Sequence, residues 1–200
     1  MRMAITYLSA IITSSKSDGL TRRLFDVDEY YRMAEAGIFS HEERVDLIRG
    51  VVVAIDHVSP AHAYCASRLN EKMVLTFHRL ATVSVLGPVR LDRWSEVTPD
   101  LSILRTRREE LDSHPGPQDI SLIVEIADKT LEFDRRIKGP MYAEVGVSEY
   151  WIVNLLRNEI EAYRHPVGSA YESLNTYHCG DRFYCTTFPD IPIDVKEILG

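Results

Sequence analysis

The pattern of apolar and polar positions is most continuous over residues 120–127, which read ISLIVEIA. A short apolar run bounded by polar residues is typical of a strand that is buried on both faces of a sheet. Glu125 interrupts this run with a carboxylate. Because an unpaired buried carboxylate is costly, we expect Glu125 to have a metal ion or a cation beside it, or a shifted pKa.

A helix is predicted directly after this strand, over about residues 131–145. Apolar residues at helical spacing predict the face that packs against the sheet: Phe133, Ile137, Met141 and Val145. A polar stripe lies beside them on the same helix: Asp134, Lys138 and Tyr142. We place this polar stripe at the boundary with solvent and expect Pro140 to kink or loosen the helix.

The N-terminal half is predicted to contain two helices and a strand pair. Asp26 starts a capping pattern, which predicts a helix over about residues 27–36. Residues 44–55 indicate a strand pair that turns at Arg49-Gly50. Ser59-Pro60 then precedes a segment with apolar residues at helical spacing, which predicts a long helix.

Strands dominate the remaining predictions. We expect strands at residues 82–91 (with an irregularity at Gly87-Pro88), 97–104, 148–153, 159–164 and 171–177. A short helix and loop at 107–118 and a last strand and helical turn at 188–199 complete the chain. This order predicts a mixed α/β (α+β) fold with one central sheet flanked by helices, and not a doubly wound sheet. We expect one domain over residues 20–200 after a disordered tail over residues 1–19.

Composition changes this picture only modestly. With 200 residues, 45% apolar and 26% charged, the chain suits one soluble domain. The net charge of −7 argues against a generally basic nucleic-acid-binding surface, but it allows a local basic groove or an acidic metal site. Three cysteines without a CxxC pair favour a reducing, cytoplasmic setting. No apolar run reaches membrane-spanning length, and residues 1–17 resemble a signal peptide only faintly.

Three residues are the strongest candidates for chemistry: Asp100, Glu125 and Lys138. Asp100 lies in a predicted strand that can neighbour the strand of Glu125, and two such carboxylates can share Mg²⁺, with Mn²⁺ as a substitute. Such an ion activates water and stabilises charge on a phosphoryl oxygen, and a lysine beside it orients the water. The motifs GxGxxG, GxxxxGK[ST], HExxH and GxSxG are absent, which removes the main support for several other classes of enzyme.

Four segments resemble a known family in their order and spacing: FDVDEYYRMAEAGIFSHEERVDLIRG, TPDLSILR, HPGPQDISLIVEIADKTLEFDRRIK and YAEVGVSEYWIVN. From about residue 20 to residue 200 the chain resembles the Uma-two family of restriction endonucleases, in the PD-(D/E)XK nuclease superfamily. The PD dipeptide is a weak signal alone, whereas the ordered set is specific. The resemblance implies a restriction-endonuclease-like core, a DNA substrate, Mg²⁺ as cofactor and a homodimer that cuts both strands.

The resemblance also assigns roles to individual residues. It implies that Asp100 and Glu125 bind the metal, with the backbone carbonyl of Ile126 as a further ligand. The superfamily usually has a lysine two residues after the acid, where this chain has Ala127. We therefore expect the catalytic lysine on the following helix, at Lys138.

Four further residues are candidates for supporting roles: Asp46, His62, Asp134 and Tyr142. Asp46 stands where the family usually has Glu, and its shorter side chain bears on whether it reaches a metal. His62 opens the first core helix, from which related nucleases supply an acid. The other two flank the lysine on its helical stripe.

Simpler interpretations remain open at each position. Glu125 and Lys138 could form a buried structural ion pair, and Asp134 with Lys138 a surface salt bridge. Lys129 is a rival lysine nearer to the acid, while His62 and Tyr142 could have structural roles. Five arginines could contact phosphates or belong to a solvated face: Arg105, Arg107, Arg108, Arg135 and Arg136. The alternative function is a catalytically inert module that keeps the nuclease fold to bind nucleic acid or protein.

Overall fold

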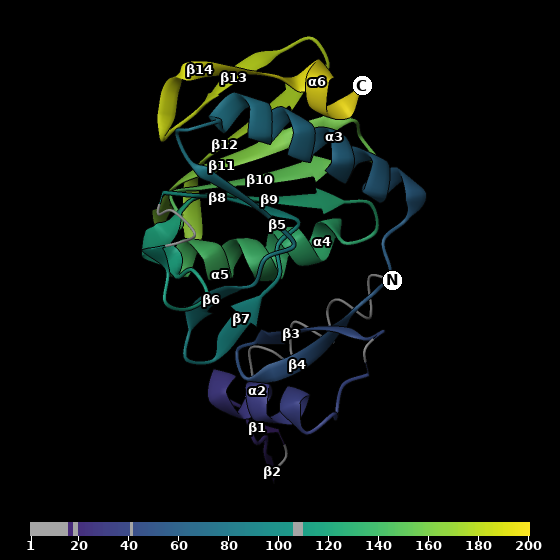
Figure 1. Ribbon diagram of the computed structural model, residues 1–200, viewed down its shortest axis with the longest axis vertical. Coiled ribbons are helices and arrows are strands. Elements are labelled where there is room, and N and C mark those ends of the chain that lie inside the picture. Colours follow the sequence, from purple (N-terminus) through teal and green to yellow (C-terminus); the bar gives the residue numbers. More distant parts are fainter. Residues whose placement is uncertain (1–15, 18–19, 41, 106–109) are drawn as a thin grey trace.

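A six-stranded mixed sheet forms the centre of the molecule (Figure 1). The computed structural model describes residues 16–17, 20–40, 42–105 and 110–200. The strand order is β12-β11-β10-β9-β8-β5, with β9 and β10 parallel and the other neighbours antiparallel. Its strands are β5 (Thr82–Val85), β8 (Leu101–Leu104), β9 (Ile120–Ala127), β10 (Glu149–Asn154), β11 (Glu159–Val167) and β12 (Ala170–His178). The predicted mixed α/β fold with helices on a central sheet is confirmed.

Two of the predicted strands are each divided between two sheets. The segment 82–91 forms β5 and β6 (Val89–Asp92), and the segment 97–104 forms β7 (Ser95–Val97) and β8. β6 and β7 join the hairpin of β3 (Arg44–Ile48) and β4 (Val51–Ile55) in a second sheet, of order β4-β3-β7-β6. Pro88 and Pro99 lie at the breaks, where a residue without an N–H cannot continue the ladder. The prediction of one sheet was therefore incomplete, and Asp100 lies just before β8 rather than within a strand.

One face of the central sheet is covered by α3 (Pro60–Phe77) (Figure 1). Ser59 caps this helix by accepting a hydrogen bond from the backbone N–H of His62 (3.1 Å). The buried side chains of α3 are all apolar and pack on the sheet: Cys65, Leu69, Met73 and Phe77. The C-terminal hairpin of β13 (Arg182–Cys185) and β14 (Phe188–Asp194) and the helix α6 (Val195–Leu199) complete this layer.

The opposite face is covered by one continuous helical segment with a widened middle. It consists of α4 (Leu131–Phe133), the π-helix η3 (Asp134–Lys138) and α5 (Gly139–Glu144). The segment lies between the central sheet and the β3–β4–β6–β7 sheet (Figure 1). The loosening that Pro140 predicts takes the form of the π turn, because proline clashes with the carbonyl of an ordinary α turn.

The N-terminal part of the described chain forms α2 (Val27–Glu35), as predicted. Asp26 and Glu29 make the predicted capping box, with Oδ1 of Asp26 accepting from the N–H of Glu29 (2.9 Å). Short strands β1 (Lys16–Ser17) and β2 (Leu20–Thr21) precede it, and the rest of the predicted tail lies outside the described residues.

No helix in the described part of the chain is long and apolar enough to cross a membrane. A 3₁₀ turn, η2 (Pro117–Asp119), follows later in the chain, and part of the predicted helix at 107–118 lies outside the described residues.

Candidate active site

The carboxylate of Glu125 is buried against the helical segment that follows its strand. Alternate residues of β9 face opposite sides of the sheet, which directs Val124 and Ile126 toward α3 and Glu125 toward η3 and α5. Nζ of Lys138 and the hydroxyl of Tyr142 both donate to Oε1 of Glu125, each at 2.8 Å. The sequence spacing of Lys138 and Tyr142 therefore does return both side chains to the strand.

Asp100, just before the neighbouring strand β8, approaches the same end of β9. Its Oδ2 accepts a hydrogen bond from the backbone N–H of Ile126 (2.8 Å) and lies 3.1 Å from Nε2 of His62. Because the amide and carbonyl of one strand residue point toward the same edge, the carbonyl of Ile126 lies on the edge occupied by Asp100. The carboxylate thus lies beside the residue that follows Glu125, at an edge where the side chains of Asp100 and His62 keep 11% and 12% of their area exposed.

Two more acids border the lysine, one from the second sheet and one from the helical segment itself. Asp46 comes from β3 of the second sheet, and its Oδ1 accepts from the backbone N–H of Thr98 (3.0 Å). Asp134 lies one helical turn before Lys138 and accepts from the hydroxyl of Thr130 (2.6 Å). Both acids act on Lys138 through space. The acid cluster, as we call it, consists of Asp46, Asp100, Glu125 and Asp134.

The prediction that the polar stripe borders solvent is wrong. Asp134, Lys138 and Tyr142 are all buried, with 2%, 6% and 0% of their area exposed. The second sheet covers this stripe. The sequence prediction placed residues 82–104 in a single sheet and therefore left the stripe uncovered. The surface salt bridge between Asp134 and Lys138 is therefore also a wrong interpretation, since both groups are inside the protein.

Burial and crowding dominate the electrostatics of the cluster. Burial raises the pKa of Glu125 to about 8. Lys138 lowers this pKa, and the nearby acids Asp100 and Asp134 raise it. Burial likewise raises the pKa of Asp134 to about 6 and raises that of Asp46. Burial lowers the pKa of Lys138, but the surrounding carboxylates raise it more, so that its net pKa is above normal and the ammonium stays charged. Three carboxylates, those of Asp46, Glu125 and Asp134, thus act on one firmly charged lysine.

The acid cluster fits a hard divalent cation at its Asp100–Glu125 end. The available donors are carboxylate oxygens and the carbonyl of Ile126, the ligand type that Mg²⁺ prefers. Among the described residues, no three His, Cys, Asp or Glu side chains form a metal-binding group, so a cation here would have at most two of these side chains as ligands. Oδ2 of Asp46 and Nδ1 of His62 are buried without a hydrogen-bond partner in the described structure. Such unpaired atoms are costly unless another group meets them.

The remaining candidates are placed less centrally. His62 touches Asp100, as the predicted supporting role requires, whereas Lys129 is exposed in the turn after β9. Arg135 pairs with Glu161 and Arg136 with Glu132. Arg105 donates to the hydroxyls of Ser121 and Ser148, and Arg107 and Arg108 lie outside the described residues.

Sequence reasoning missed two groups that hold the acids. Thr130 stands four residues before Asp134, and this helical spacing was a legible signal for a hydrogen bond. Thr98 uses its backbone N–H to hold Asp46 across two strands, and no side-chain pattern signals such a contact.

The fold and the placement of the acids define the class as a restriction-endonuclease-like protein. The family model described as "Putative restriction endonuclease" (Uma2) matches residues 27–196, and the chain belongs to this family. A solved structure described as "a putative nuclease belonging to DUF820 from Anabaena variabilis" has the same fold, with a TM-score of 0.69 at 11% sequence identity. That similarity covers 88% of this chain and 97% of the other. Among curated proteins, none matches the sequence.

Proposed function

We propose that this protein is a magnesium-dependent endonuclease that hydrolyses phosphodiester bonds in DNA. The observation that carries the proposal is the convergence of Asp100, Glu125 and Lys138 at one end of β9. Membership in a restriction-endonuclease family supports the reaction class. The raised pKa values of the buried acids Glu125 and Asp134 support a bound cation, since a further positive charge there would favour their ionised forms.

Asp100 and Glu125 would hold the ion, together with the carbonyl of Ile126. The cation supplies positive charge that stabilises the phosphoryl transition state and lowers the pKa of the attacking water. Lys138 donates to Glu125 and so directs its ammonium into the cluster, where it would position the attacking water. His62 and the N–H of Ile126 hold the carboxylate of Asp100 in place. The homodimer stays a prediction from the family resemblance.

Cleavage of supercoiled plasmid with Mg²⁺ or Mn²⁺ tests the assignment. We expect Asp100→Asn and Lys138→Met each to lower the rate at least about a hundredfold, the size expected when one transition-state contact is lost. Two matched controls, Asp190→Asn and Lys129→Met, change an exposed acid and the exposed rival lysine and should cleave normally. Equal cleavage by wild type and both site variants would sink the assignment, and a loss only in Lys129→Met would transfer the role to that lysine.

One observation favours the inert alternative. Oε1 of Glu125 already accepts two hydrogen bonds, from Lys138 and Tyr142, so the pair resembles a complete structural ion pair. Thermal unfolding with and without Mg²⁺ separates the two functions. A nuclease should be stabilised by about 2.7 kcal/mol at a hundredfold excess of Mg²⁺ over its Kd, and Asp100→Asn should lose this gain. An inert module should show no response to the metal, and Glu125→Gln should leave it equally or more stable.

A further inference from the structure

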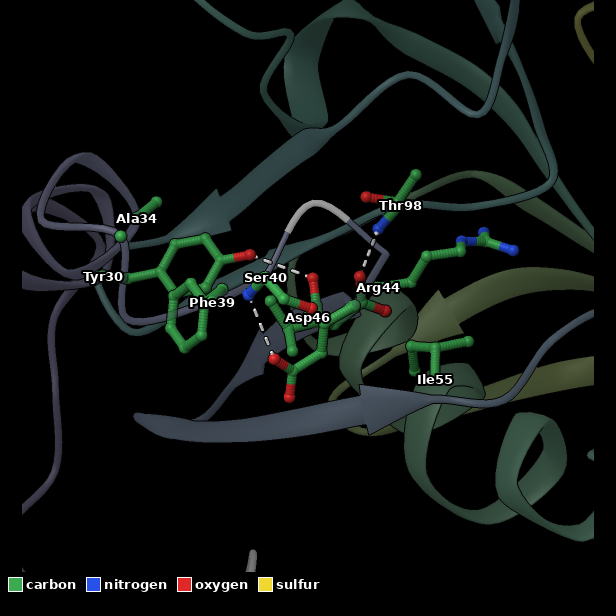
Figure 2. Close-up of a pocket in the computed structure, with 11 residues that line it drawn as sticks. Tyr30, Ala34, Phe39, Ser40, Arg44, Asp46, Ile55 and Thr98 are labelled. Carbon is green, nitrogen blue, oxygen red and sulfur yellow. Dashed lines mark hydrogen bonds between the residues drawn. The ribbon is translucent and has the colours of Figure 1, made fainter.

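A cavity of about 600 Å³ opens beside the acid cluster, between α2 and β3 (Figure 2). We call it the β3 cavity and define it by Tyr30, Phe39, Arg44, Asp46, Ile55 and Thr98. Asp46 belongs both to its wall and to the acid cluster, so the two are continuous. The volume lies in the range of sites for small molecules and is sufficient for one nucleotide but not for a duplex.

Aromatic rings form one end of the β3 cavity. Tyr30 and Phe39 lie side by side there, with ring centroids 5.6 Å apart and planes inclined by 40° (Figure 2). The hydroxyl of Tyr30 donates to the backbone carbonyl of Val45 (2.9 Å), which fixes its ring on β3. Both side chains are only partly buried, and such rings are platforms on which a nucleobase stacks.

The side chain of Arg44 extends at the other end of the cavity (Figure 2). The side chain of Arg44 makes no hydrogen bond or ion pair with a residue in the described ranges, although its charge lowers the pKa of nearby Asp46, whereas Arg49 and Arg90 are each paired with an acid. Arg44 and Asp46 point to the same face of β3, since they are two residues apart. A guanidinium at this place is suited to a phosphate, which it can bind through two parallel hydrogen bonds.

The acid at the cavity rim indicates which way such a ligand lies. Glu43 accepts a hydrogen bond from the backbone N–H of Ser40 (3.3 Å), so its negative charge stays near the aromatic end. A phosphate is repelled there and attracted to Arg44, while an uncharged base tolerates Glu43. The cavity is therefore complementary to a base at one end and a phosphate at the other.

We propose that the β3 cavity binds one unpaired nucleotide of DNA next to the bond that is cut, with its base on Tyr30 and Phe39 and its phosphate on Arg44. This proposal rests on the proposed nuclease function and specifies its substrate. In a duplex each base is stacked on its neighbours, so only a base that has left the stack can lie on these rings. The preferred substrate is then single-stranded, gapped or branched DNA rather than an intact duplex.

Fluorescence anisotropy with labelled oligonucleotides in EDTA tests the preference in the absence of cleavage. We expect wild type to bind DNA with an unpaired segment about tenfold more tightly than a duplex of equal length, the scale of one stacked base. Phe39→Leu keeps the apolar contact but removes the aromatic face, and Arg44→Gln removes the cation; each should reduce the preference to less than about threefold. Arg79→Gln removes the same charge outside the cavity and should keep the full preference.

Each outcome separates this inference from the proposed function. Equal affinity of wild type for duplex and unpaired DNA overturns the cavity proposal, even if the plasmid is cleaved. Loss of affinity for both DNAs to the same degree in Phe39→Leu also overturns it. A preference that depends on Phe39 and Arg44, in a protein that cleaves no DNA, supports the cavity and overturns the nuclease. Circular dichroism of each variant shows that the fold is retained.

Discussion

The two faces of the central sheet are covered by helices of opposite character. The side chains that α3 buries against the sheet are apolar, and their burial contributes about 25 cal/mol per Å² of apolar area. The segment of α4, η3 and α5 instead buries Asp134 and Lys138 beside Glu125. Buried charge opposes folding unless it is well paired, and a hydrophobic filling of the same volume is often equally or more stable. The difference teaches that the second face is shaped by something other than stability, which is why the chemistry is assigned to it.

Among single substitutions on the two faces, removal of the lysine should have the largest effect on the free energy of unfolding. Lys138→Met leaves three buried acids, Asp46, Glu125 and Asp134, without their shared cation, and breaking such a buried pair costs about 3–5 kcal/mol. The loss should be greatest at alkaline pH and smaller near pH 5, where the acids with raised pKa values are protonated. Urea unfolding at the two pH values measures it.

A compensating variant sharpens that result. Glu125→Leu combined with Lys138→Met removes both partners of the pair and should recover part of the stability, because only Asp46 and Asp134 then remain without the lysine. The double variant should be folded and unable to cleave DNA. If it were as unstable as Lys138→Met alone, the pair would not be the source of the loss.

A cavity in the apolar face should cost somewhat less and respond differently to pH. Leu69→Ala removes a fully buried side chain from the contact of α3 with the sheet and should destabilise by about 2–5 kcal/mol. Because no titratable group lies among the side chains that α3 buries there, apart from the thiol of Cys65, the loss should be equal at pH 5 and pH 8. A pH-dependent loss would contradict the division of the two faces.

The apolar half of this comparison was predictable from sequence, and the polar half only in part. The spacing of apolar residues and the capping residues were sufficient to predict α2, α3 and β9, because those signals are local in the sequence. The division of residues 82–104 between two sheets was not, although Pro88 and Pro99 marked the breaks. The pairing partners of short strands depend on tertiary contacts, and the spacing of apolar residues does not reveal those contacts.

The same reason limited prediction of the site. The spacing of Lys138 and Tyr142 predicted that they share a stripe, and both do reach Glu125. Their burial depended on the second sheet, which supplies Asp46 and covers the stripe. A helix pattern gives the direction of a side chain, but not what is packed over it.

The pH dependence of stability should show the polar face directly. Glu125 has a folded pKa of about 8 against an ordinary value of 4.5, so the folded state binds its proton more tightly than the unfolded state. This group's contribution is complete below about pH 4.5 and is lost as the pH rises through 8, so the Tm of wild type should fall between pH 5 and pH 8. Glu125→Gln imitates the protonated acid and should show a flatter curve. Parallel curves for the two proteins would contradict the raised pKa of Glu125.

The smallest effect is expected where the same helical segment meets solvent. Nε of Arg136 lies 2.8 Å from Oε2 of Glu132 one turn earlier, but 68% of the Arg136 side chain is exposed. Water and salt screen such a pair, so Arg136→Ala should cost about 0.3–0.5 kcal/mol and leave plasmid cleavage unchanged. Arg135→Ala is the matched comparison, because Arg135 donates two hydrogen bonds to the buried Glu161 and its loss leaves that carboxylate without its cation. If Arg136→Ala lost cleavage without losing stability, its guanidinium would be a DNA contact, and the functional surface would extend beyond the buried face to the solvent side of this segment.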